Sequence, residues 1–132
     1  MLGLLAVTRF IDFALRMKEL PDVHLLYVEL PIPSALATLP SVGDDTVKRY
    51  YTAEAEAVLH PAMGRLAKKG IIATPHSVLG DPADTVVAQA AALECTLIWL
   101  GAHGKSSGQG PILGSVAARV VHLAKCAVMI SR

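Results

Sequence analysis

Five short apolar runs, separated by longer stretches with a helical pattern, constrain the fold of this chain more than any other feature. The runs are Leu2–Val7, Val23–Glu29, Ile71–Leu79, Thr96–Leu100 and Cys126–Ser131. Their apolar character is nearly continuous rather than alternating, which is typical of parallel strands buried on both faces. Because stretches with a helical pattern separate most of these runs, we predict a parallel sheet of five strands with right-handed crossovers.

Three of the intervening stretches carry clear helix signals. From Asp44 to Lys69 apolar residues recur every three or four positions, and Gly70 follows where a glycine commonly ends a helix. Asp81 and Pro82 provide a capping residue and a first helical residue for the next helix. A last helix is predicted to begin at Ser115. The expected fold class is therefore a single Rossmann-like α/β domain over residues 1–132, with helices on both faces of an open sheet.

Length and charge limit the classes of protein to which this chain can belong. Its 132 residues suit one domain with its own core. The formal net charge is +1 with dispersed basic residues, which argues against nucleic acid as a partner. No apolar run approaches the length that spans a membrane, so we expect no membrane insertion. Cys95 and Cys126 belong to no paired motif, and we expect buried thiols in a cytoplasmic protein.

The segment from Gly101 to Ser115 concentrates the residues that can bind an anion. It holds five of the ten glycines, follows a predicted buried strand and leads into a predicted helix. Glycine permits close approach of backbone N–H groups to a ligand, and the start of a helix offers free N–H groups and a positive dipole end. Lys105 and several serines add further donors. We predict a phosphate-binding turn, with a flexible surface loop as the alternative.

Two common phosphate-binding motifs do not fit this segment. Gly104 and Lys105 resemble the end of a Walker A loop, but Trp99 stands where that motif requires its first glycine. Gly108 and Gly110 resemble the start of a dinucleotide fingerprint, but Leu113 stands where the third glycine is required. The spacing of the glycines therefore indicates a different nucleotide motif.

That spacing resembles the nucleotide motif of the universal stress protein family, in its ATP-binding branch. Two residues separate Gly101 from Gly104, and nine separate Gly104 from the pair Gly114-Ser115. Further segments also resemble the family: His24–Val28, Gly80–Ala83, Gly114–Ala117 and Ala124–Val128. The similarity covers nearly the whole chain and is weakest before Val23.

The resemblance implies both a topology and a ligand. The sheet is expected to have the strand order 3-2-1-4-5, and the protein to form a homodimer partly through the last strand, Cys126–Ser131. The ligand is expected to be ATP, or ADP or AMP, accompanied by Mg²⁺ or Mn²⁺ held mainly by phosphate oxygens and water. The residues expected to line the site are Val28, Leu100, Gly101, His103, Gly104, Gly114, Ser115 and Val116. For His103, an exposed loop residue without contact to the ligand is the alternative.

One departure from the family pattern lies near the N-terminus. Family members that bind ATP usually carry an aspartate in a short turn after the first strand, whereas Val7 is followed here by Thr8, Arg9 and Phe10. The predicted crossover from Val7 to Val23 is also short for a parallel connection. Either the turn has been lost, or a segment after Val7 is missing from the sequence.

No arrangement of residues typical of catalysis is evident. The chain has no nucleophile elbow and no pair of carboxylates with an evident acid–base arrangement, and His24, His60, His76 and His122 lack metal-ligand spacing. The leading hypothesis is a dimeric stress-response regulator that binds ATP and hydrolyses it slowly at most. The alternatives are a slow ATPase or nucleotidyl transferase using His103 or Lys105, and a nucleotide-free interaction module.

Overall fold

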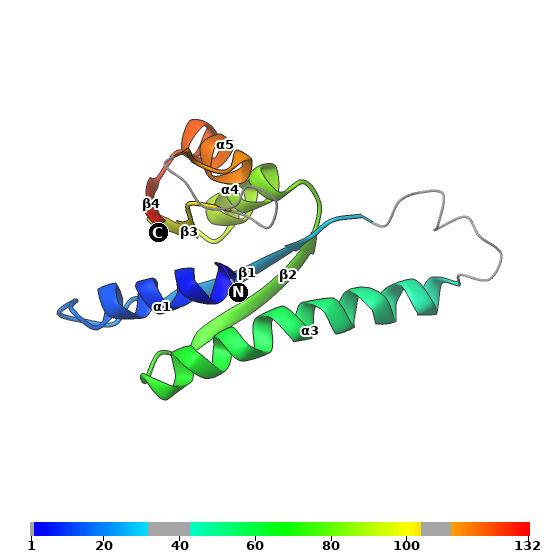
Figure 1. Ribbon diagram of the computed structural model, residues 1–132, viewed down its shortest axis with the longest axis horizontal. Helices are drawn as coiled ribbons and strands as arrows, with labels where there is room; N and C mark the ends of the chain where they lie inside the picture. Colours follow the sequence, from blue (N-terminus) through cyan, green and yellow to red (C-terminus); the bar gives the residue numbers. More distant parts are fainter. Residues whose placement is uncertain (1, 32–42, 104–111) are drawn as a thin grey trace.

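The computed structural model describes residues 2–31, 43–103 and 112–132, which form four helices and four strands (Figure 1). In chain order they are α1 (Leu2–Ala14), β1 (Val23–Glu29), α3 (Asp44–Lys68), β2 (Ala73–Leu79), α4 (Pro82–Ala92), β3 (Leu97–Gly101), α5 (Ser115–Leu123) and β4 (Ala127–Ser131). Four of the predicted strands and all three predicted helices are therefore present, with small changes at their ends.

The four strands form two separate parallel pairs rather than one sheet. β1 pairs with β2 in a register that runs from Val23 opposite Ala73 to Glu29 opposite Leu79. β3 pairs with β4, from Leu97 opposite Ala127 to Gly101 opposite Ser131. The parallel pairing was predicted correctly. The prediction of a five-stranded sheet is wrong for the described part of the chain, which holds two sheets of two strands each.

The first predicted strand, Leu2–Val7, is instead the beginning of α1. The Thr8 hydroxyl donates a hydrogen bond of 2.9 Å to the Leu4 carbonyl one turn earlier, as in a continuous helix. The apolar pattern continues past Val7 at helical spacing, and Ile11 and Ala14 are buried on the inner face. A short apolar run fits a buried strand and a buried helix equally well, and here the longer period decides.

This helix also changes where the predicted short crossover begins. Because Val7 lies within α1, the connection to β1 begins after Ala14, and the two explanations for the missing turn stay predictions. The predicted order 3-2-1-4-5 would put its central strand between the strands now labelled β1 and β3. At that position the structure has a cavity of about 460 Å³, lined by parts of α1, β1 and β3. Phe10 and Phe13 of α1 lie beside Trp99 of β3, with ring centroids 5.6 and 5.1 Å apart.

The ends of the helices follow the sequence signals. The Asp81 carboxylate accepts a hydrogen bond of 3.1 Å from the Asp84 N–H, and Pro82 is the first residue of α4. Gly70, just after α3, adopts a φ of +77°, a conformation that favours glycine. These predicted boundaries are confirmed because each depends on contacts within a few residues.

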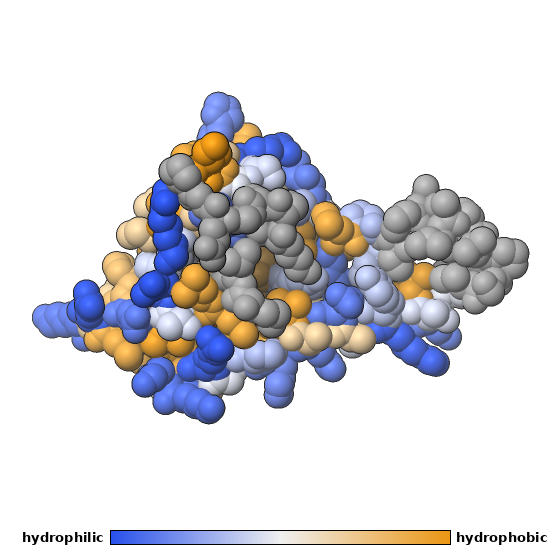
Figure 2. Space-filling model, viewed as in Figure 1, coloured by the Kyte–Doolittle hydropathy of each residue, from blue (hydrophilic) through white to orange (hydrophobic). Residues whose placement is uncertain are grey.

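The core is divided between the two sheets. One cluster joins α1, the end of α3 and the start of β2, and consists of Ile11, Ala14, Leu66, Ile71 and Ala73. The other joins β3 to α4 and α5 and consists of Ala83, Ala90, Ile98 and Val120. α3 runs along the β1–β2 pair, and hydrophilic side chains follow its outer side (Figures 1 and 2). The two clusters hold each strand pair to its own helices.

Candidate functional site

The turn between β3 and α5 is anchored by backbone hydrogen bonds. The Ala102 N–H donates to the Ser131 carbonyl at 2.8 Å, and the Gly114 N–H donates to the Ala102 carbonyl at 2.7 Å. Ala102 is itself buried, with 2% of its surface exposed. The residue that follows β3 therefore holds both the end of β4 and the residue that precedes α5.

The start of α5 has free hydrogen-bonding capacity. Its N-cap is Gly114, whose φ is −61° and ψ is 160°, and no side chain among the described residues caps the helix there. The first hydrogen bond of the helix runs from the Ala118 N–H to the Gly114 carbonyl. The N–H groups of Ser115, Val116 and Ala117 precede that bond, so they have no acceptor within the helix. Together with the helix dipole they form a site suited to an anion.

His103, a predicted site residue, contacts the other end of this turn. The His103 Nε2 lies 3.0 Å from the Ile112 carbonyl. Because a carbonyl only accepts, Nε2 carries the proton and donates this bond. The interaction joins the two ends of the segment 104–111. Gly104 and Lys105 lie in that segment, outside the described residues, so their predicted roles stay predictions.

The two described glycines of the motif do not adopt a left-handed backbone. Gly70 is the only glycine with positive φ among the residues that the structure describes. A side chain added at Gly101 would meet the Ala6 Cβ at 3.7 Å and the His103 carbonyl oxygen at 3.8 Å, which are ordinary contacts. Backbone strain and packing within the chain therefore do not account for glycine at 101.

The predicted site residues lie in both halves of the molecule. Leu100 and Gly101 are the last two residues of β3, close along the chain to the turn that leads to Gly114. Val28 is the penultimate residue of β1, where it pairs with Val78 in the other sheet. The structure brings the end of β3 and the start of α5 together. Val28 belongs to the other strand pair.

Sequence reasoning missed the residues that support this turn. The Trp99 indole N–H donates to the Ser131 hydroxyl at 3.1 Å, and that hydroxyl lies 3.4 Å from the Leu100 carbonyl oxygen. Ser131 and Ala102 thus fix the turn through contacts between β3 and β4. Neither residue is a glycine of the motif, and only the strand register could have indicated their role.

A histidine pair was also missed. His24 Nδ1 and His76 Nε2 lie 2.9 Å apart on the neighbouring strands β1 and β2, and the Asp22 carboxylate is 3.8 Å from the other nitrogen of His24. The two histidines lie 52 positions apart in the sequence, so spacing could not reveal the pair. Across residues 2–31, 43–103 and 112–132, no group of three or more His, Cys, Asp or Glu side chains could hold a metal ion.

The two cysteines are free and only partly buried, which corrects the expectation of buried thiols. Burial is the main cause that raises the pKa of Cys95, and the nearby Cys126 and Asp22 raise it further. The raised pKa keeps Cys95 a neutral thiol near pH 7. A reactive cysteine would instead require a lowered pKa. In the part of the chain that the structure describes, no helix has the length and apolar character needed to cross a membrane.

These observations define an α/β protein in which parallel strands alternate with helices and an uncapped helix start lies at a strand end. The sequence model of the universal stress protein family matches residues 5–132. The chain therefore belongs to the universal stress protein family. No curated protein sequence matches it.

Solved structures agree with this assignment. A universal stress protein in complex with cAMP is 27% identical, with a TM-score of 0.69, and the match covers 98% of this chain and 88% of that one. The universal stress protein UspA from Lactobacillus plantarum is 24% identical, with a TM-score of 0.75 and coverages of 97% and 88%. A universal stress protein from Archaeoglobus fulgidus in complex with dAMP is 21% identical, with a TM-score of 0.60 and coverages of 98% and 88%.

Proposed function

We propose that this chain binds an adenine nucleotide, ATP foremost, at the turn between β3 and α5, and that it acts in the cytoplasm as a dimeric regulator of the stress response. The observation that carries the proposal is the uncapped start of α5, held beside the end of β3 by the Ala102 backbone. Related proteins in complex with cAMP and dAMP support an adenine nucleotide as the ligand.

Different residues at the turn are expected to contact the phosphate groups and the ribose and base of the nucleotide. The N–H groups of Ser115 and Val116 face no acceptor within α5, and with the Ser115 hydroxyl they donate to phosphate oxygens. Gly101 leaves space beside the strand end, where a side chain would meet the ligand, and Leu100 contributes apolar surface for the ribose and base. His103 already donates from Nε2 to Ile112, so its contribution is to hold the turn rather than to bind phosphate directly.

A divalent cation fits this arrangement only as a companion of the nucleotide. No carboxylate belongs to the described part of the turn, residues 101–103 and 112–116. Mg²⁺ or Mn²⁺ would therefore be held by phosphate oxygens and water, and it would neutralise phosphate charge. We expect hydrolysis to be slow, because the described part of the turn holds no carboxylate that could act as a general base and His103 already donates to Ile112.

The proposed dimer pairs two copies partly through β4. This strand lies at the outer edge of its sheet, and Met129 on it is 38% exposed. An open strand edge with exposed apolar side chains is suited to pairing with a second copy. Sedimentation analysis of the wild-type protein and of Met129→Lys tests this part of the proposal, which predicts a dimer only for the wild type.

Calorimetric titration with ATP and Mg²⁺ tests nucleotide binding. Saturable micromolar binding is expected for the wild type and at least a tenfold loss, or about 1.4 kcal/mol, for Gly114→Val, whose branched side chain stands at the start of α5. Gly64→Val in α3 is the matched control, because nothing lies within 4 Å of the position of its added Cβ. Equal affinity in both variants contradicts the proposal.

One observation favours a second candidate, an interaction module without nucleotide. Residues 2–14 form a helix, so the strand and turn that carry an aspartate in nucleotide-binding relatives are not found there. The two candidates differ in the same titration. Absence of any heat of binding at millimolar ATP supports the interaction module, and saturable binding excludes it.

A further inference from the structure

Glu29 is a buried carboxyl group that the proposed nucleotide site does not use. It is the last residue of β1 and only 5% exposed, and no other charged residue in the described ranges is buried to this degree. Its Oε1 has no hydrogen-bond partner there. A buried polar atom without a partner lowers the stability of the fold, so its presence calls for an explanation.

The surroundings of Glu29 make ionisation difficult. Burial is the main cause that raises the pKa of Glu29, and repulsion from Glu54 on α3 raises it further. The Ser77 hydroxyl on β2 acts in the opposite direction, because its hydrogen bond favours the charged form. A positively charged hydrogen-bond donor is the partner that would satisfy the free oxygen and offset both unfavourable effects.

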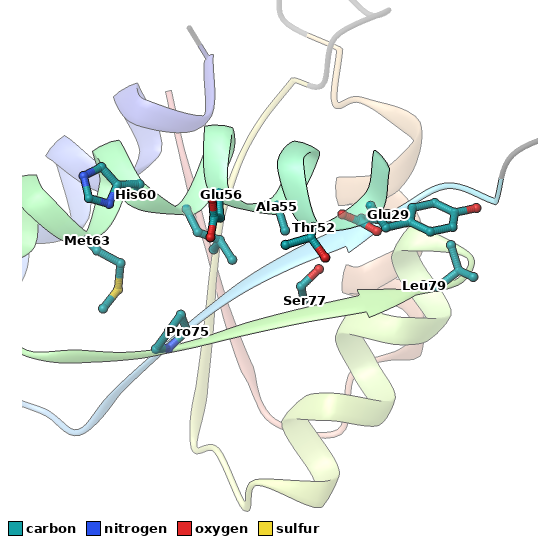
Figure 3. A pocket seen from close by; sticks show the side chains of 11 residues that line it. Glu29, Thr52, Ala55, Glu56, His60, Met63, Pro75, Ser77 and Leu79 are labelled. Carbon is teal, nitrogen blue, oxygen red and sulfur yellow. The ribbon is translucent and has the colours of Figure 1, made fainter. Parts of the chain in front are cut away.

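A groove beside Glu29 has room for such a partner. It lies between α3 and the β1–β2 pair and has a volume of about 690 Å³ (Figure 3). Glu29 and Ser77 lie toward one end of it, and Met63 and His60 toward the other. Between them lie the aliphatic residues Ala55, Leu59 and Pro75, together with the polar side chains of Thr52 and Glu56 (Figure 3). A ligand here would meet the buried carboxyl group of Glu29 at one end and mainly apolar side chains along its length, with Glu56 beside them.

We propose that this groove binds a small organic cation, with a primary ammonium group at the Glu29 carboxylate and an aliphatic body along Ala55, Leu59 and Met63. An anion is disfavoured because Glu56 and Glu54 add negative charge on α3, and His60 is the only basic residue in the lining. None of the described residues of the β3–α5 turn lines the groove. The proposal therefore does not depend on nucleotide binding.

Three ligands of equal length separate the contributions of charge and apolar body. Calorimetric titration of the full chain with hexylammonium, hexanol and hexanoate should show saturable binding of the ammonium. The alcohol should bind about tenfold more weakly, because it lacks the charge-assisted hydrogen bond, and the carboxylate should not bind. Equal affinity for the ammonium and the alcohol would overturn the proposal, since Glu29 would then contribute nothing.

Two glutamates on the same groove provide matched variants. Glu29→Gln keeps the size of the side chain but removes its charge, and it should weaken hexylammonium binding about tenfold or more. Glu56→Gln removes an exposed charge from the lining and should change the affinity less than about threefold. Equal losses in the two variants would show that only the general negative charge matters, and this would also overturn the proposal.

A measurement on the unmodified protein keeps the test independent of how the variants fold. Met63 lies at the end of the groove away from Glu29, and the NMR signal of its methyl group should shift with hexylammonium along the same saturation curve as the heat. Binding without a shift at Met63 places the ligand elsewhere and refutes the site. ATP binding in Glu29→Gln should be unchanged, so failure of either proposal can be recognised separately.

Discussion

The two strand pairs of this protein differ in how completely their helices cover them. The β3–β4 pair packs against α4 and α5 through a continuous cluster that includes the fully buried Val120. The β1–β2 pair is well packed only near the start of β2, where Leu66 and Ala73 are buried, and most later residues of β2 are exposed. The predicted phosphate-binding turn lies on the covered pair. The groove with Glu29 lies on the β1–β2 pair, which we call the open pair, as β3–β4 is the covered pair. Incomplete packing of the open pair thus creates a second possible site.

The largest effect on stability is expected from a substitution at Leu66, which is buried against the open pair. Leu66→Ala removes a side chain that is 1% exposed and should lower the free energy of unfolding by about 3 kcal/mol. Urea denaturation measures this loss. Because Leu66 lies far along the chain from the turn and in the other cluster, the affinity of the folded variant for ATP should stay within about twofold of the wild type. A large loss of affinity would show that the two pairs are not independent.

On the covered pair, Val120→Ala should lower stability less than Leu66→Ala does, but it should lower the affinity for ATP more. Val120→Ala removes two methyl groups from a fully buried residue of α5 and should cost about 2 kcal/mol. The cavity loosens the helix whose start forms the proposed anion site, so ATP affinity should fall together with stability. Denaturation and calorimetric titration measure the two quantities. Unchanged affinity despite the lost stability would contradict the link between this core and the turn.

Gly80 offers a test of the connection between the two pairs. Its N–H donates to the Glu29 carbonyl at 2.9 Å, just after β2 and before α4. A Cβ added at Gly80 would lie 2.6 Å from the Thr85 Oγ1, so Gly80→Ala should destabilise the fold by about 1 to 2 kcal/mol. Adding Thr85→Ala removes the clashing atom and should restore most of this loss in a double-mutant cycle. Strictly additive losses would show that the contact is not the cause.

The pH dependence of stability should distinguish the open pair from the covered one. Burial, followed by repulsion from Glu54, raises the pKa of Glu29 above the usual 4.5. The folded state therefore binds a proton more tightly than the unfolded state, and this contribution to stability is lost as the pH rises through the raised pKa. The difference in urea midpoint, wild type minus Glu29→Gln, should decrease as the pH rises above about 4.5. A difference that stays constant with pH would contradict the assignment to Glu29.

The elements that sequence patterns predicted correctly are those fixed by neighbours in the chain. The strand Val23–Glu29 has the predicted bounds, and Asp81 and Gly70 act at helix ends through contacts within a few residues. Leu2–Val7 was predicted wrongly because a run of six apolar residues carries no period of its own, and only its continuation to Ala14 favours a helix.

For the candidate site, the sequence indicated the turn but not what supports it. The glycine spacing pointed to the segment after β3, and the uncapped start of α5 agrees with that expectation. The supports at Ala102 and Ser131 depend on which strands are neighbours, which local patterns do not contain. Glu29 gave no signal either, because a glutamate at the end of an apolar run is normally exposed.

The separation of the two strand pairs has a consequence for how this chain behaves at high concentration. A single open sheet has two free edges, whereas two separate pairs have four. Two of these edges, on β1 and β3, flank the cavity of about 460 Å³. Unpaired backbone along a strand is a template for another polypeptide, so each added edge is a further route to self-association. Local opening of the fold that exposes these inner edges should therefore promote aggregation, and solubility should depend on keeping them covered.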